Sequence, residues 1–125
     1  MSGYTVKNFE DIEPTGGGGG VEARFARKFL DSRQLGVSLF RYAPDAKVPF
    51  GHFHGEQEEA YVVVGGSGRV KLDDEVIELK RWDVVRVAPE VVRAFQGGPD
   101  GLELVCVGGD KPPEGDGEKV EDFWA

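Results

Sequence analysis

Residues 51–66 read GHFHGEQEEAYVVVGG and contain both histidines of the chain, His52 and His54. Side chains two positions apart on a β-strand point to the same face, so a strand through this stretch brings the two imidazoles together. Glu58 and Glu59 follow a short break and open an apolar run. If Glu59 starts the next strand and faces inward, two imidazoles and one carboxylate converge. That is the facial ligand set of non-haem iron and related divalent metals, and it leaves positions open for water or substrate.

A simpler interpretation of the same stretch is a pair of solvated histidines at a strand edge beside an acidic, solubilising turn. An isolated His-x-His pair is a weak signal, and short motif matches often mislead. The residues alone therefore leave both interpretations open.

The composition is that of a soluble, single-domain globular protein. The chain has 125 residues, of which 39% are hydrophobic and 30% charged, and its formal net charge is −8. This length suffices for one core, and the negative charge disfavours nucleic acid and anionic membrane surfaces as partners. The N-terminus lacks an apolar segment of signal-peptide length and no stretch is long enough to span a bilayer, so we expect a cytoplasmic protein. The single cysteine, Cys106, lies in an apolar run and is expected to be a small core residue.

Short apolar runs with a period of two, separated by glycine and proline, predict an all-β protein. There are 19 glycines and seven prolines, and such regular spacing of strands and turns is typical of a sandwich or barrel. The expected strands are 22–30, 35–43, 59–65, 68–73, 75–80, 83–88 and 102–108, with a further short strand through 93–96.

We expect one domain over residues 1–125, with its barrel core at about 22–109. The five glycines of 16–20 predict a flexible loop over 15–20. The acidic tail, 110–125, is polar until Phe123 and Trp124, which we expect to dock onto the barrel or onto a second subunit.

The stretch 51–66 resembles the first motif of the cupin family. Here a His-x-His pair is followed after four residues by Glu59 and after six more by Gly66, and a Glu-Glu-x-Tyr run precedes the glycine turn. The family's opening glycine falls on Ala46, and the resemblance covers about residues 35–108. It implies a double-stranded β-helix, which is a jelly-roll barrel. It also implies that the two histidines and Glu59 are ligands of a divalent metal ion (iron, manganese, nickel or zinc), and that the protein is a homodimer.

The second motif of the family, which supplies a fourth ligand from a histidine, is degenerate in WDVVRVAPEVVRAFQG (82–97). One alignment places Arg93 at the histidine and another, shifted by one, places Ala94 there. Arginine stays protonated and cannot bind a metal. Three arrangements remain: Arg93 turns outward, solvated or salt-bridged, and leaves a three-ligand metal site; it pairs with Glu59 in a metal-free pocket; or its planar donors hold the anionic group of a metal-bound substrate.

The function that we expect from these features is that of a small metal-binding cupin that binds, and as an enzyme would transform, a small anionic metabolite. An enzyme of this kind would be a metal-dependent oxygenase or isomerase. Arg93, Tyr61 and Phe95 are candidates to line the ligand pocket at the barrel mouth, although aromatic residues at strand period are also typical of a core. The alternative is a non-catalytic ligand-binding or sensor protein without metal, in which Arg93 pairs with Glu59.

Overall fold

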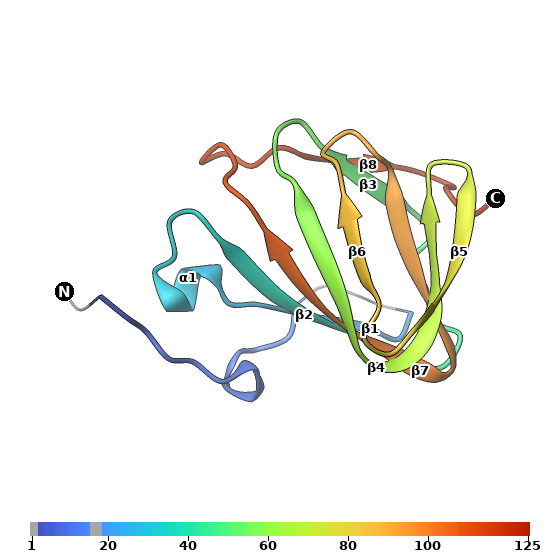
Figure 1. The fold of residues 1–125 in the computed structure, drawn as a ribbon, viewed down its shortest axis with the longest axis horizontal. Coiled ribbons are helices and arrows are strands. Elements are labelled where there is room, and N and C mark those ends of the chain that lie inside the picture. Colours follow the sequence, from blue (N-terminus) through green and yellow to red (C-terminus); the bar gives the residue numbers. More distant parts are fainter. Residues whose placement is uncertain (1–2, 16–18) are drawn as a thin grey trace.

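The computed structural model describes residues 3–15 and 19–125, and these form an almost entirely β structure (Figure 1). A 3-10 helix, η1 (Phe9–Asp11), and a short helix, α1 (Arg27–Leu30), are the helical elements of the described residues. The strands are β1 (Val21–Phe25), β2 (Gly36–Tyr42), β3 (Gly51–His54), β4 (Glu59–Leu72), β5 (Glu75–Lys80), β6 (Val84–Val87), β7 (Arg93–Gly108) and β8 (Gly117–Val120).

The strands belong to one antiparallel sheet that curls into a barrel around the two longest strands, β4 and β7. Strand β7 pairs with β2, β3 and β4, while β4 pairs with β5, β6 and β7. Strand β3 pairs with the first residue of β7 and the first residues of β4 pair with its last residues, and the curl of the sheet brings these two regions together at one end of the barrel. This arrangement positions the candidate site.

The barrel core consists of side chains that alternate along the strands, as the period of two predicts. They are Tyr61, Val63, Val70, Leu79, Val87, Phe95, Leu102, Leu104 and Cys106. Cys106 is 4% exposed, which confirms the predicted core position of the cysteine.

Two predicted strands, 59–65 and 68–73, are one continuous strand, β4, in the structure. The glycines between them form irregularities in the pairing with β7 rather than a chain reversal. Gly66 has φ of 67°, and a Cβ at this position would collide with the carbonyl oxygen of Gly101, so no side chain would fit. The glycine signal therefore marks a bend within a strand. In the same way, 93–96 and 102–108 are both parts of β7.

The predicted strand 22–30 is wrong beyond Phe25. The chain leaves the sheet there and forms the single turn of α1, which ends at Asp31 in the left-handed region with φ of 55°. The Arg27 side chain donates to the carbonyls of Arg33 and Gly109 and so ties this turn to the neighbouring chain. These partners come from outside the segment, so its local pattern gave no sign of them.

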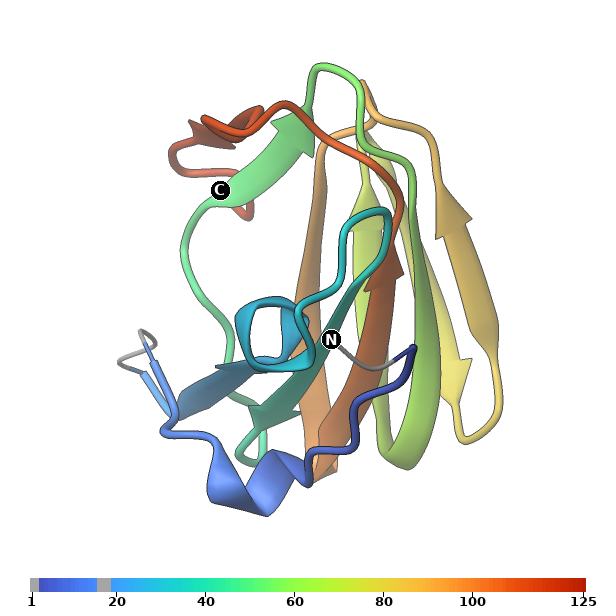
Figure 2. The same cartoon turned by 90° about the vertical axis from the view of Figure 1, so that its left-hand side faces the viewer.

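The C-terminal segment lies along β3 at one end of the barrel (Figure 2). Strand β8 pairs with β3, and the backbone N–H of Phe123 donates to the carbonyl of Pro49 at 3.2 Å. Lys47 and Arg69 lie over the Trp124 ring, 5.1 and 5.2 Å from its centroid. The two aromatic residues thus dock onto the barrel of their own chain.

Part of the predicted glycine loop, 16–18, lies outside the described residues. In the described part of the chain, the helices are too short and too polar for any of them to span a membrane.

Candidate metal centre

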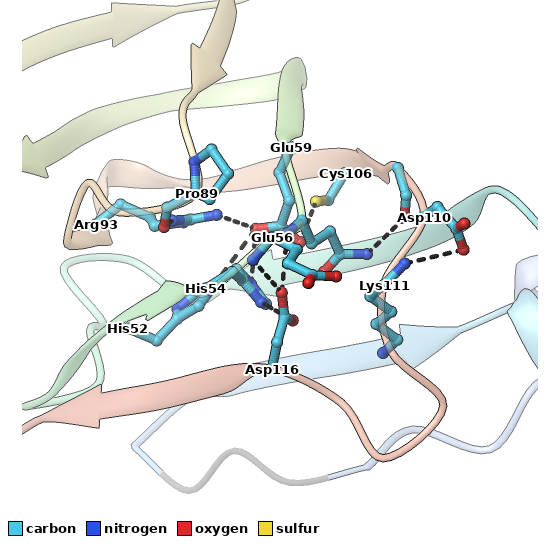
Figure 3. A network of polar contacts seen from close by, with 12 residues as sticks. His52, His54, Glu56, Glu59, Pro89, Arg93, Cys106, Asp110, Lys111 and Asp116 are labelled. Carbon is cyan, nitrogen blue, oxygen red and sulfur yellow. Dashed lines mark hydrogen bonds and ion pairs between the residues drawn. The ribbon is translucent and has the colours of Figure 1, made fainter.

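His52 and His54 project from β3 toward Glu59, the first residue of β4 (Figure 3). The imidazole rings meet edge to face, 5.2 Å between centroids. One potential ligand atom from each of the three residues lies within 4.8 Å of the other two, and no further group of three such residues occurs in 3–15 and 19–125. The sequence therefore found the three side chains that the fold brings together.

Glu59 is the centre of this cluster. Its Oε1 accepts hydrogen bonds from Tyr61 Oη at 2.6 Å and from Arg93 Nη2 at 2.7 Å. The same oxygen lies 3.6 Å from Nε2 of His52 and 3.4 Å from Nε2 of His54. Burial alone would raise the pKa of this carboxyl group, but its interactions with the histidines, Tyr61 and Arg93 hold the pKa far below its usual value. Glu59 is therefore an anion at neutral pH.

His54 has a second acidic partner on the other side of its ring. Its Nδ1 lies 2.8 Å from Oδ1 of Asp116, which comes from the segment just before β8. Interaction with Glu59, and secondarily with Asp116, raises the pKa of His54 although burial opposes the shift. The same two carboxylates would attract a metal cation to this imidazole. Nothing in the sequence singled out Asp116, because it lies 62 positions from His54 in a tail that reads as solvated.

The donor set fits a divalent ion such as iron, manganese, nickel or zinc. Atoms that share one ion at bonds of about 2.1 Å lie about 3.0 Å apart in octahedral and about 3.4 Å apart in tetrahedral geometry, close to the two His–Glu separations of 3.6 and 3.4 Å. Nε2 of His54 is buried without a hydrogen-bond partner, which is costly unless some group binds it. Two imidazoles and a carboxylate suit these metals, whereas calcium and magnesium prefer oxygen ligands only.

Comparison with solved structures identifies the fold. A cupin protein from Bacteroides fragilis superimposes with a TM-score of 0.74 at 24% identity, over 90% of this chain and 89% of that one. The chain has the cupin fold. A variant of Streptomyces Pac13, a nucleoside dehydratase, was solved with uridine and gives a TM-score of 0.79 at 20% identity, over 98% of this chain and 94% of that one. A variant of Bacillus subtilis oxalate decarboxylase gives a TM-score of 0.70 at 25% identity, over 85% of this chain and 30% of that larger protein. No protein-family model matches the sequence, and neither does any curated protein.

Arg93 lies inside the barrel rather than on its surface. It pairs with His52 in the register of β3 and β7, and its side chain is completely buried. Besides the bond to Glu59, Nη1 donates to the carbonyls of Pro89 and Val91 at 3.2 and 2.8 Å, and Nε lies 3.4 Å from Tyr61 Oη. Of the three arrangements considered from the sequence, the outward-facing arginine is wrong and the pair with Glu59 is present.

Tyr61 and Phe95 pack against each other with ring centroids 4.7 Å apart, and both are 3% exposed. Only Tyr61 reaches the cluster, through its hydroxyl group. Phe95 belongs to the apolar core beneath it. Cys106, which the sequence placed in the core, also approaches the site, with Sγ 3.5 Å from Oε2 of Glu59.

Two surface hollows of the barrel lie away from the cluster. One, of about 560 Å³, is bordered by parts of β1, β2 and the bends of β4 and β7, and the other, of about 390 Å³, lies beside Arg69 and Gln96. Neither includes a residue of the histidine–glutamate cluster, so the chemistry of the cluster gives no reason to assign these hollows to its ligand.

Proposed function

We propose that this cupin binds one divalent metal ion through His52, His54 and Glu59, and binds a small anionic metabolite beside it. The observation that carries the proposal is the buried Nε2 of His54, which has no hydrogen-bond partner and lies 3.4 Å from the Glu59 carboxylate. A nitrogen held in this way next to an anion favours a positive charge, and a divalent metal ion supplies it in place of a proton. Iron, manganese, nickel and zinc are the candidates.

When bound, such an ion would act as a Lewis acid toward a ligand oxygen and would lower the pKa of bound water. The open side of the site is that of His52, whose side chain is 38% exposed, against 11% for His54. A ligand would approach there. The structure of a Pac13 variant with uridine supports a small molecule as the ligand of this chain.

Arg93 would attract an anionic ligand by its positive charge rather than by a bidentate hydrogen bond. Four of its five N–H groups face Tyr61, Pro89, Val91 and Glu59, so only one on Nη2 remains for a substrate. In this proposal the arginine holds Glu59 in place and adds positive potential to the pocket, while a bound metal makes the direct contact with the anion.

A second candidate is a ligand-binding cupin without metal, and the ion pair between Arg93 and Glu59 favours it. The two groups are 2.7 Å apart, with side chains 0% and 12% exposed, so Glu59 already has a cationic partner. In that case the pair and the two histidines would form a polar pocket that binds its ligand by hydrogen bonds alone.

Metal titration of the purified, untagged protein separates the two candidates. We expect one zinc or manganese ion per chain, determined by elemental analysis after dialysis, and no binding after His54→Ala or Glu59→Gln. Glu58→Gln is the matched control, because Glu58 is the neighbouring carboxylate but is exposed and paired with Arg86. Unchanged metal content in a His52→Ala/His54→Ala double variant would place the metal elsewhere, and no metal in the wild type after supplementation would favour the second candidate.

A further inference from the structure

We propose that Asp116 is a positioning residue for His54: it fixes the orientation and the tautomer of the imidazole, so that Nε2 offers its lone pair to a divalent cation. This inference rests on the proposed metal site and extends it to the C-terminal segment, more than 50 residues beyond the three ligands.

Both carboxylate oxygens of Asp116 are engaged. Oδ1 lies 2.8 Å from Nδ1 of His54, while Oδ2 accepts hydrogen bonds from the backbone N–H groups of Glu56 and Gln57 at 2.7 and 2.8 Å. The Asp116 side chain is only 7% exposed. These three contacts fix the orientation of the carboxylate. Asp116 thereby links the His54 ring to the turn that precedes Glu59.

The protonation of the ring follows from this contact. An ionised carboxylate can only accept hydrogen bonds, so Nδ1 of His54 must carry a proton. In the neutral ring, Nε2 then keeps its lone pair, and this atom is the buried, unpartnered one that lies 3.4 Å from Oε1 of Glu59. The ring thus lies between the two acidic side chains, with its donor side toward Asp116 and its acceptor side toward the cluster (Figure 3). A carboxylate behind a histidine ligand commonly fixes the tautomer in this way.

The backbone pairing makes the contact a feature of the fold. In the register of β3 and β8, Gly117 lies opposite His54, which places Asp116 just beyond the end of β3. The N–H of Gly55 donates to the Asp116 carbonyl at 3.2 Å and continues the ladder by one more bond. The C-terminal segment therefore delivers the carboxylate to a defined position beside the ring.

His52 provides an internal comparison. Its side chain is 38% exposed, and in the described part of the chain no carboxylate pairs with its Nδ1, while its Nε2 lies 3.6 Å from Glu59. Its tautomer is consequently not fixed by a partner. Of the two histidines, only His54 is held in advance in the form that a metal requires.

The test combines the tautomer of His54 with zinc affinity in the wild type, Asp116→Ala, Asp116→Asn and Glu118→Gln. The last variant is the matched control, because it removes the same charge from an exposed position of the same segment. Imidazole nitrogen NMR spectra of the metal-free proteins, recorded at a pH where the rings are neutral, report which nitrogen carries the proton. Competition with a chelator reports zinc affinity.

We expect the wild-type His54 ring to carry its proton on Nδ1, and zinc affinity to fall at least about tenfold in both Asp116 variants. Asp116→Asn is the sharper of the two. An asparagine that keeps both backbone bonds with its oxygen turns its NH₂ group toward Nδ1, which moves the ring proton to Nε2 and blocks the lone pair. Glu118→Gln should leave both the tautomer and the affinity unchanged.

A wild-type His54 protonated on Nε2, or Asp116 variants that are folded by circular dichroism and bind zinc like the wild type, would overturn the inference. The wild-type spectrum needs no variant, so it decides the tautomer even if a substitution prevents folding. It also separates this inference from the proposed function: a wild type that binds no zinc contradicts the metal site, whereas the nitrogen spectrum still reports whether Asp116 fixes the ring.

Discussion

Replacing Arg93 with methionine should weaken the metal-free fold and strengthen metal binding at the same time. The guanidinium group is completely buried and bonds to Glu59 at 2.7 Å. Removing one partner of a buried ion pair leaves an uncompensated charge and costs about 3–5 kcal/mol. With an m-value of about 2 kcal/mol/M, the urea midpoint should fall by roughly 2 M.

The effect on metal binding has the opposite sign, because Arg93 repels a divalent cation. At a separation of about 5 Å and an effective dielectric of about 20, the repulsion is about 7 kcal/mol. The bond that holds Glu59 in place contributes only about 1.5–3 kcal/mol, so the loss of repulsion dominates. If screening by Glu59 and water leaves two thirds of the repulsion, about 4.4 kcal/mol, the gain still exceeds the larger of these values by about 1.4 kcal/mol, which corresponds to tenfold tighter binding.

Urea unfolding in the presence of a chelator, followed by zinc titration, measures both effects. The matched control is Arg86→Met, because Arg86 bonds to Glu58 at 2.6 Å but the two side chains are 70% and 57% exposed. That surface pair should be worth at most about 1 kcal/mol. Arg93→Lys keeps the charge and should leave zinc affinity low. The reasoning is refuted if Arg93→Met is as stable as Arg86→Met, or if it binds zinc no better than Arg93→Lys.

Two further predictions concern the tail and the cysteine. Truncation after Glu118 should lower the free energy of unfolding by about 2 kcal/mol, measured by thermal or urea denaturation, because Phe123 and Trp124 lose their half-buried positions on the barrel; an unchanged melting temperature would show that their packing contributes nothing. Burial, and then the Glu59 anion, raise the pKa of the Cys106 thiol. The fold thus favours the protonated thiol, a contribution that is present below the unfolded pKa of about 9 and lost as the pH rises through the folded pKa. At pH 8 a thiol reagent should label the native protein much more slowly than the urea-unfolded protein, and equal rates would contradict the buried position.

The sequence predicted the fold class because strand formation leaves a local pattern. Alternation with a period of two is visible within six residues, and it marked β5 with its correct bounds, 75–80. It did not reveal that the glycines near Gly66 bend a strand instead of ending it, since that depends on the close approach of Gly101 from β7. It also missed the turn of α1, which Arg27 stabilises through carbonyls outside the segment.

Part of the candidate site could likewise be predicted from the sequence, and part of it depends on the tertiary structure. His52, His54 and Glu59 lie within eight positions, and the sequence by itself predicted this cluster, because strand geometry puts both imidazoles on one face and the connection to Glu59 is short. Only the tertiary structure decided that Arg93 faces inward, because the pairing of β7 with β3 and β4 sets the direction of its side chain. Only the tertiary structure brought Asp116 to His54, through the pairing of β8 with β3. A contact across 62 residues depends on the register of strands that fold together, and no local pattern carries that register.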